Sequence, residues 1–287
     1  MKLTSLALAA LLAFVQAPAL RPDPPHKCFD CDDWNRPHEP FKIYGNTYYV
    51  GVAGLSSILI TGSAGSILLD GGLPQSAPII DRNIRKLGFK TEDIRLIVNS
   101  HAHYDHAGGI AALQRVSKAS VAASAAGKLA LERGEPTPDD PQFAFGHDAN
   151  AFPALKDVHA YTDRAALRVG ELAITPHAVP GHTAGATTWS WRSCEGEDCK
   201  NIVYADSLNA VSAPAFRFTG DASHPSIVEQ FRRSIETMAA LPCDMMIPVH
   251  PVWDAKDALK PGSCRVYAAE AAKRLDARIA EEQRGRR

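Results

Sequence analysis

The 287-residue chain carries four side chains that commonly bind metal ions within one short segment. They are His101, His103, Asp105 and His106. Imidazole nitrogen and carboxylate oxygen atoms together form a ligand set that suits Zn²⁺. An apolar run ends just before this segment and two glycines follow it, which predicts a turn from a strand into a helix. Such a turn can direct alternate side chains toward two different metal ions.

Two more histidines lie in turns that follow apolar runs. His182 has a glycine shortly before and after it, and His250 lies between Val249 and Pro251. Turns of this kind hold a side chain where the backbone leaves a sheet. Together the six donors supply three ligands to each of two zinc ions and leave open positions, as catalytic zinc requires. The alternative, a polar loop that is rich in histidine, would not account for His182 and His250.

Hydrophobic periodicity and turn residues indicate the elements that must position these donors. Runs that predict strands occupy residues 47–52, 57–61, 66–69, 96–99, 172–175, 202–204 and 245–249. Helical patterns occupy residues 76–88, 109–116, 226–241 and 265–281. The first three strands predict an antiparallel meander. Strands and helices in both halves of the chain favour an α/β (α+β) layered fold, in which polar side chains collect at strand ends.

The N-terminal region differs from the rest of the chain. Residues 1–19 contain Lys2, a short apolar run and small residues before Leu20, which is typical of a cleaved signal peptide. The apolar run is too short to span a bilayer, and the alternative is an apolar N-terminal helix of the domain. Residues 20–40 predict an irregular N-terminal arm, because they are rich in proline and aspartate without periodicity. We expect a periplasmic protein with a single domain in residues 41–287.

Composition limits the partners that we expect. The chain is 45% hydrophobic and 22% charged, which is ordinary for a globular protein. Its formal net charge of −1 gives no reason to expect nucleic acid or an anionic membrane as a partner.

The chain has six cysteines, an even number that fits three disulfide bonds in an exported protein. Nearest neighbours along the sequence would pair Cys28 with Cys31, Cys194 with Cys199, and Cys243 with Cys264. Six cysteines allow fifteen pairings, so this choice stays open. The competing interpretation is a structural zinc site that uses Cys28 and Cys31, but a second close pair of the usual ribbon type is missing.

The spacing of the six donors resembles the pattern of the metallo-β-lactamase superfamily, and the resemblance spans most of the chain after residue 19. It implies a four-layer αβ/βα sandwich with two Zn²⁺ per chain at one edge, between the sheets. The first zinc ion would be held by His101, His103 and His182, and the second by Asp105, His106 and His250.

Residues 205–209 are most similar to the third subclass of class B β-lactamases. The resemblance implies that Ser207 and Asn209 position the substrate carboxylate. Asp206 would then support the site from behind, whereas many thioesterases and lactonases of the superfamily use an aspartate there to bridge both metals.

Other features fit the same subclass. The pair Cys243 and Cys264, which flanks His250, is one of them. Gln142 resembles a pocket glutamine of certain members, and the alternative is an exposed loop residue. Phe216 stands near the place where some members use a tyrosine hydroxyl on the lactam carbonyl, so that contribution would be absent.

The resemblance therefore implies a secreted zinc-dependent β-lactamase. It would hydrolyse the amide bond of β-lactam antibiotics, including carbapenems, with a zinc-activated hydroxide that Asp105 orients. The expected partner is a small β-lactam molecule, bound by a monomer. One alternative is a lactonase or thioesterase of the same superfamily, which would use the same metals on a different acyl group. Another is a non-catalytic zinc-binding protein, which would have every ligand position closed.

Overall fold

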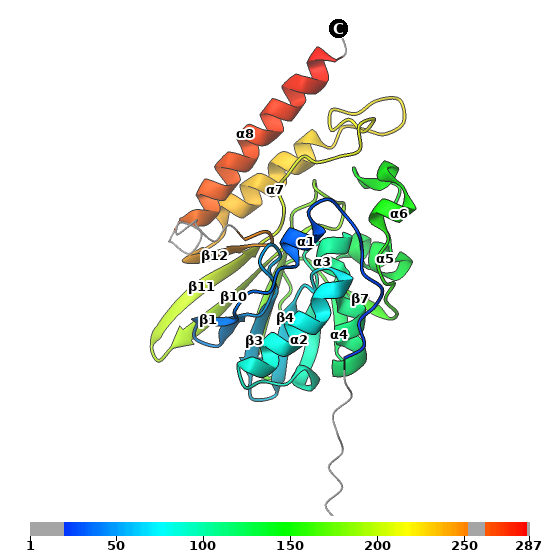
Figure 1. Cartoon of the computed structure of the whole chain (residues 1–287). Coiled ribbons are helices and arrows are strands. Elements are labelled where there is room, and N and C mark those ends of the chain that lie inside the picture. The colour runs from blue at the N-terminus through cyan, green and yellow to red at the C-terminus, as the bar shows by residue number, and fades with distance from the viewer. Residues whose placement is uncertain (1–19, 252–261, 286–287) are drawn as a thin grey trace, which may run out of the picture.

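The structure is a computed structural model that describes residues 20–251 and 262–285 (Figure 1). The predicted signal peptide, residues 1–19, lies outside the described residues. The strands are β1 Phe41–Tyr44, β2 Thr47–Tyr49, β3 Ile58–Gly62, β4 Gly65–Leu69, β5 Ile94–Val98, β6 Ser120–Ala123, β7 Val158–Ala160, β8 Leu167–Val169, β9 Leu172–Ala178, β10 Thr187–Glu195, β11 Asp198–Ala205 and β12 Met245–Pro248. The helices are α1 Cys31–Trp34, α2 Ala77–Lys86, α3 Tyr104–Ala107, α4 Ile110–Ser117, α5 Ala125–Arg133, α6 His147–Asn150, α7 Val228–Ala240 and α8 Ser263–Arg284. Within the described ranges, no helix is both long and apolar enough to cross a membrane.

The strands form two sheets. The first contains β1 to β7 in sequence order. Its strands from β1 to β4 are antiparallel neighbours, and those from β4 to β7 are parallel. The second sheet has the order β12-β11-β10-β9-β8, in which β11 and β12 are parallel and the other neighbours are antiparallel. The antiparallel meander is confirmed, although it begins one strand earlier than predicted, at β1.

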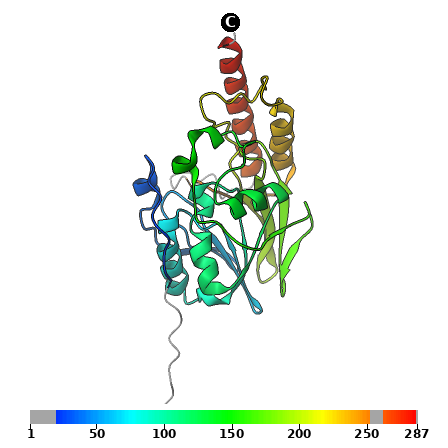
Figure 2. The ribbon, with the colours of Figure 1, turned by 90° about the vertical axis from the view of Figure 1, so that its right-hand side faces the viewer.

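Three apolar clusters hold the layers together. Successive side chains of a strand point to opposite faces, so Leu68 of β4 faces α2, α4 and α5, whereas Ile67 faces the second sheet. Trp189 and Trp191 of β10 fill the space between the two sheets. The third cluster joins the second sheet to α7 and α8. The predicted four-layer αβ/βα sandwich is therefore confirmed, with helices outside two central sheets (Figure 2).

The ends of the strands bring the predicted donors to one edge of the sandwich. β5 ends just before His101, and β12 ends two residues before His250. His182 lies in the turn between β9 and β10. Because β5 is parallel to β4 and β12 is parallel to β11, the carboxyl ends of each pair open at the same edge. The fold therefore gathers residues that are far apart in the sequence.

The N-terminal arm is more ordered than its sequence indicates. It contains one helical turn, α1, where we expected only irregular backbone. Cys31 and Trp34 pack in an apolar cluster with Val52 and Leu55 of the body, which supplies the order that local sequence lacks. α2 begins close to the predicted position, but the hydroxyl of Ser76 donates to Oδ1 of Asn35 in the arm at 2.7 Å instead of capping the helix.

All three predicted disulfide bonds are present. They join Cys28 to Cys31, Cys194 to Cys199, and Cys243 to Cys264. Because both sulfur atoms of the first pair are bonded to each other, the competing zinc site at Cys28 and Cys31 is wrong.

Glu282 joins α8 to the loop before α7 through a buried carboxylate that is only 2% exposed. It accepts hydrogen bonds from the backbone N–H of Phe218 and of Thr219, both at 3.0 Å, and from the guanidinium of Arg278 at 2.8 Å. Burial raises the pKa of Glu282, but these donors outweigh it, so the pKa lies below its ordinary value. The charged form therefore stabilises the fold.

We predict that Glu282→Ala lowers the free energy of unfolding by about 3 kcal/mol at pH 7, because its buried donors lose their acceptor. The measurement is denaturation in urea. The contribution of Glu282 should be present above its unfolded-state pKa and be lost as the pH falls through the lower folded-state pKa. The exposed neighbour Glu281 is the control, and Glu281→Ala should cost less than about 0.5 kcal/mol. Equal losses in the two variants would contradict this assignment.

Candidate active site

The segment after β5 buries its polar side chains. His101 is 1% exposed, His103 is 4% exposed and His106 is fully buried. The backbone turns from extended at His103 into α3, which places Asp105 and His106 in the first turn of that helix. Buried polar groups require partners, because an unpaired buried donor or acceptor costs free energy. Each of these buried rings therefore needs a polar partner.

The first donor set consists of His101, His103 and His182. One ligand atom from each lies within 4.8 Å of those of the other two. The ring centroids of His101 and His182 are 4.7 Å apart, and those of His103 and His182 are 5.0 Å apart. Nδ1 of His182 donates to the backbone carbonyl of Asn209 at 2.9 Å, which leaves Nε2 to bind a metal. These are the three residues predicted for the first zinc ion.

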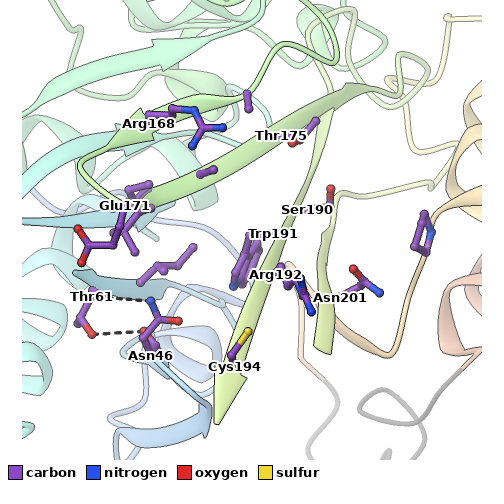
Figure 3. A pocket seen from close by; sticks show the side chains of 16 residues that line it. Asn46, Thr61, Arg168, Glu171, Thr175, Ser190, Trp191, Arg192, Cys194 and Asn201 are labelled. Atoms are coloured by element: carbon purple, nitrogen blue, oxygen red, sulfur yellow. Dashed lines mark hydrogen bonds between the residues drawn. The ribbon is translucent and has the colours of Figure 1, made fainter. Parts of the chain in front are cut away.

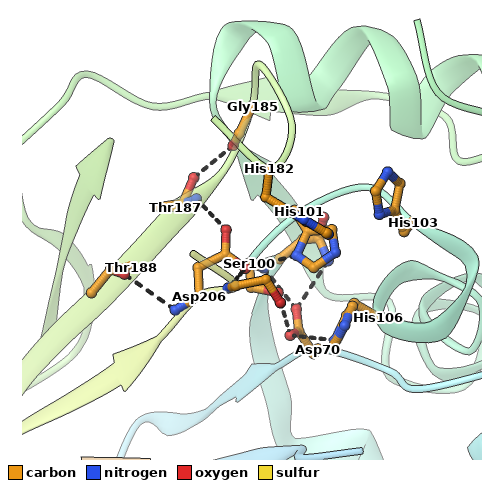
Figure 4. Close-up of polar contacts among 12 residues, drawn as sticks. Asp70, Ser100, His101, His103, His106, His182, Gly185, Thr187, Thr188 and Asp206 are labelled. Carbon is orange, nitrogen blue, oxygen red and sulfur yellow. Dashed lines mark hydrogen bonds and ion pairs between the residues drawn. The ribbon is translucent and has the colours of Figure 1, made fainter. Parts of the chain in front are cut away.

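Carboxylates lie behind the other two rings of the first donor set (Figure 4). Nδ1 of His101 donates to Oδ1 of Asp206 at 2.7 Å, and Nε2 of His103 lies 3.2 Å from Oδ2 of Asp140. Asp206 also accepts the backbone N–H of Thr187 at 3.0 Å. Partners of this kind fix the orientation and tautomer of a metal-binding imidazole. They leave Nε2 of His101 and Nδ1 of His103 as the ligand atoms.

The second donor set consists of Asp105, His106 and His250. Nε2 of His106 lies 3.1 Å from Nε2 of His250, and Oδ2 of Asp105 lies 3.2 Å from the former and 3.3 Å from the latter. With bonds of about 2.0–2.2 Å, the ligand atoms of a tetrahedral zinc ion lie about 3.3–3.6 Å apart. The three atoms thus form one face of a tetrahedron of nearly the right size. The residues fit a zinc ion in both chemistry and spacing.

Asp70 lies behind the second donor set. Its carboxylate accepts hydrogen bonds from the backbone N–H of Ser100 at 2.7 Å, from Asn99 at 2.9 Å and from the hydroxyl of Tyr204 at 2.8 Å. Oδ2 of Asp70 is 3.5 Å from the buried Nδ1 of His106. We did not predict a role for Asp70 or Asp140. The available signal was that Asp70 is a polar residue directly after the apolar run of β4.

The pKa values of the donors reflect where a positive charge is favoured. Burial, with the neighbouring histidines, holds the pKa of His101 well below its ordinary value and lowers that of His182 to about 4, so both rings stay neutral. Burial also opposes protonation of His106, but Asp105 and Asp70 outweigh it and raise its pKa to about 10. The second donor set therefore attracts a cation, and a metal ion can take the place of that proton.

The three predicted substrate-binding residues lie close to the first donor set. The amide nitrogen of Gln142 is 3.5 Å from Nδ1 of His103 and 3.5 Å from Nε2 of His182. Ser207 is almost fully buried and donates its backbone N–H to Asp206 at 2.7 Å. Asn209 contributes its carbonyl to His182, as described above. Gln142 thus lies next to metal-binding atoms, whereas Ser207 and Asn209 contact the groups behind them, and contact of all three with a substrate stays a prediction.

Phe216 lies in the loop between β11 and α7. Its ring packs edge-on against His224, with centroids 4.5 Å apart, and against Phe218, with centroids 5.2 Å apart. A tyrosine hydroxyl does contact the segment around Asp206: that of Tyr267 of α8 donates to the carbonyl of Asp206 at 2.8 Å. Tyr267 therefore holds the turn that carries Ser207, a role that sequence spacing did not indicate.

A cavity of about 780 Å³ lies elsewhere, and it is lined mainly by residues of β8 to β11 in the second sheet, together with residues of β3 and β4 (Figure 3). Its lining includes Thr61, Arg168 and Trp191, and it contains none of the six metal-binding donors. The cluster of buried histidines, and not this cavity, identifies the candidate active site.

We predict that Asp140→Asn weakens zinc binding by about 10–100-fold, because the neutral amide no longer supports His103 with a negative charge. The dissociation constant would be measured by competition with a chelating dye. Asp139, the exposed neighbour, provides a matched control, and Asp139→Asn should bind zinc as tightly as the unchanged protein. Unaltered affinity in Asp140→Asn would show that Asp140 does not support the site.

Known structures resemble this chain over most of its length. The Rm3 metallo-beta-lactamase is 46% identical and superposes with a TM-score of 0.84, over 90% of this chain and 99% of that one. MEM-A1, a subclass B3 metallo-beta-lactamase from a soil metagenome library, is 43% identical with a TM-score of 0.83, over 88% of this chain and all of that one.

A curated relative and a family model complete the comparison. Hydroxyacylglutathione hydrolase of Anaeromyxobacter dehalogenans (strain 2CP-C) is 32% identical over 160 residues, which are 56% of this chain. The chain spans about half the length of that relative, 48%. The model of the metallo-beta-lactamase superfamily matches residues 50–250, which include all six donors. The chain therefore belongs to the metallo-beta-lactamase superfamily.

Proposed function

We propose that this protein is a zinc-dependent β-lactamase that hydrolyses the amide bond of β-lactam antibiotics, carbapenems included. The observation that carries the choice of substrate is the position of Asp206. Its two carboxylate oxygens accept hydrogen bonds from His101, Thr187 and Ser207. An aspartate engaged in this way supports a ligand from behind and is not placed to bridge two metals. The similarity to Rm3 and MEM-A1 over most of the chain supports the same choice.

The two donor sets would each hold one Zn²⁺, the first through three imidazoles and the second through Asp105, His106 and His250. Zinc bound there would lower the pKa of a water molecule toward about 7 and polarise a carbonyl group. The chain's own contribution is orientation. The partners behind His101, His103 and His182 hold each ring in one tautomer, and the burial of the site strengthens every charge interaction within it.

Asp105 is the residue that we assign to proton transfer. Its Oδ2 contacts His106 and His250 at 3.2 and 3.3 Å. Oδ1 takes no part in these two contacts, so it is the atom that would accept a proton from the attacking water and later return it to the ring nitrogen. A base of this kind contributes about 10²–10⁴-fold to a rate.

Substrate orientation would come from Ser207, Asn209 and Gln142. Ser207 and Asn209 would bind the substrate carboxylate, and the amide of Gln142 would donate to a substrate oxygen. Phe216 has no hydroxyl, so we assign no polarisation of the lactam carbonyl to that position.

A second candidate is hydrolysis of a thioester or lactone, which the similarity to hydroxyacylglutathione hydrolase favours. The same donors could serve it, because the metals act on a carbonyl group in either case.

We also propose that the protein acts in the periplasm as a monomer, after removal of residues 1–19. Three disulfide bonds support this location, because disulfides persist in oxidising compartments.

We predict that the purified protein hydrolyses a penicillin, a cephalosporin and a carbapenem in the presence of zinc. A chelator should abolish the activity, and added Zn²⁺ should restore it, because the donors alone supply no activated water. The loss of lactam absorbance measures turnover, and metal analysis should give two zinc ions per chain. Turnover of a lactone or a thioester without any β-lactam hydrolysis would reject the proposal in favour of the second candidate.

We further predict that Asp105→Asn lowers kcat by about 10²–10⁴-fold, since the amide cannot accept the proton. Steady-state kinetics would be measured beside metal analysis, so that loss of zinc is distinguished from loss of the base. Asp148 is an exposed carboxylate on α6, and Asp148→Asn should leave kcat unchanged. A zinc-loaded Asp105→Asn variant with full activity would exclude Asp105 as the base.

A further inference from the structure

His250 differs from the other donors in how it is held. Its side chain is 36% exposed, whereas those of His106 and Asp105 are 0% and 10% exposed. In the part of the chain that the structure describes, no carboxylate or carbonyl contacts the second ring nitrogen of His250. The strand that carries it, β12, ends two residues earlier at Pro248. Among the described residues, this ring has an aromatic neighbour instead.

The aromatic ring of Trp34 contacts His250. The two ring centroids are 5.2 Å apart, and the ring planes are inclined by 54°. Trp34 is the last residue of α1, the single helical turn of the N-terminal arm. In Figure 1, α1 lies beside the end of β12, near the centre of the view. A segment more than two hundred residues away in the sequence thus packs on a metal-binding donor.

The arm is attached to the body beside this contact. The backbone carbonyl of Trp34 accepts from the N–H of Gly54, and that of Arg36 accepts from the N–H of Ala53, both at 2.9 Å. A Cβ atom at Gly54 would lie 2.6 Å from Cδ1 of Trp34, so the indole rests directly on this glycine. At the other end of α1, the disulfide bond to Cys28 holds the buried Cys31.

The loop that receives the arm is bonded to the backbone just before His250. Ser56 donates its N–H to the carbonyl of Val249 at 2.9 Å and its hydroxyl to the carbonyl of Pro248 at 2.7 Å. One connected unit therefore runs from Trp34 through Gly54 and Ser56 to Val249, and the indole closes it on the ring of His250. Both the backbone and the ring of this donor depend on the same unit.

We propose that residues 28–36, stapled by the Cys28–Cys31 disulfide, act as a clamp that holds His250 in its ligand position, with Trp34 as the positioning residue. This inference rests on the proposed function, since it assumes that the second donor set binds a metal. An exposed imidazole loses rotational freedom when it binds a metal, and packing against one face removes part of that freedom beforehand. The clamp thus favours metal binding at the second donor set in particular.

The test is zinc binding by the full chain with Trp34 replaced. We expect Trp34→Ala to weaken the second of two zinc equivalents by about 10–100-fold, as loss of a supporting partner does, and to leave the first unchanged. Trp34→Phe should restore most of the affinity, because a ring again packs on His250. Arg36→Ala is the matched control, because this exposed side chain lies on the same arm. Competition with a chelating dye gives both constants, and the absorption spectrum of bound Co²⁺ reports the geometry of each site.

A second variant displaces Trp34, backbone and indole together, without replacing it. Gly54→Ala places a methyl group 2.6 Å from Cδ1 and 2.7 Å from Cα of Trp34, so Trp34 must move away, and we expect the variant to weaken the second zinc equivalent as Trp34→Ala does. Unchanged affinity for the second equivalent in both variants would overturn the clamp. Equal weakening of both equivalents would also overturn it, because the arm would then support only the fold as a whole.

These measurements are independent of the reaction. If the unchanged protein hydrolyses no β-lactam but its second zinc equivalent depends on Trp34, the proposed substrate is wrong and the clamp stands. If β-lactam hydrolysis is observed and the second equivalent does not depend on Trp34, the proposed function stands and the clamp is wrong.

Discussion

The hydrogen bonds and charge contacts between the buried histidines and the groups behind them are the interactions on which this site depends. Burial disfavours a protonated imidazole ring, and positive charges on neighbouring rings would repel one another. Such a cluster is therefore stable only if each ring has a defined partner. Asp206, Asp140 and Asp70 supply three of these partners, and the carbonyl of Asn209 supplies a fourth. They also leave the opposite ring atoms directed toward one another. The geometry suited to a metal ion therefore follows from the need to give each buried ring nitrogen a polar partner.

Two of the supporting aspartates follow strands that are neighbours of strands carrying donors. Asp70 follows β4 and His101 follows the parallel neighbour β5, while Asp206 follows β11 and His250 follows the parallel neighbour β12. The carboxyl ends of parallel neighbours lie at the same edge of a sheet, so Asp70 contacts His106 from the adjacent strand, whereas Asp206 contacts His101 from the other sheet. The apolar side chains between the two sheets fix the separation of these pairs. Packing far from the metal-binding atoms thus sets their distances.

The N-terminal arm adds a contact that the sandwich cannot supply. His250 lies at the end of an edge strand, where fewer neighbours are available, and the indole of Trp34 occupies part of that space. The ordering of the arm costs conformational entropy, which its disulfide bond and apolar cluster offset. An arm that is held by its disulfide bond and by contact with the body is suited to position a donor that, among the described residues, has no polar partner on its second ring nitrogen.

The sequence by itself indicated the six candidate donors and the meander, implied the four-layer fold through a resemblance, and suggested the three cysteine pairs from nearest neighbours among fifteen possible pairings. These depend on local spacing, on periodicity and on a resemblance that local motifs carry. Only the tertiary structure decided which group lies behind each ring. Asp70 and Asp140 are distant in the sequence from the histidines that they support, and no local motif marks them. It likewise decided that Ser76 binds the arm through Asn35 instead of capping α2, and that Trp34 reaches His250. Contacts between distant segments depend on how the layers pack against each other, and local sequence patterns do not predict that packing.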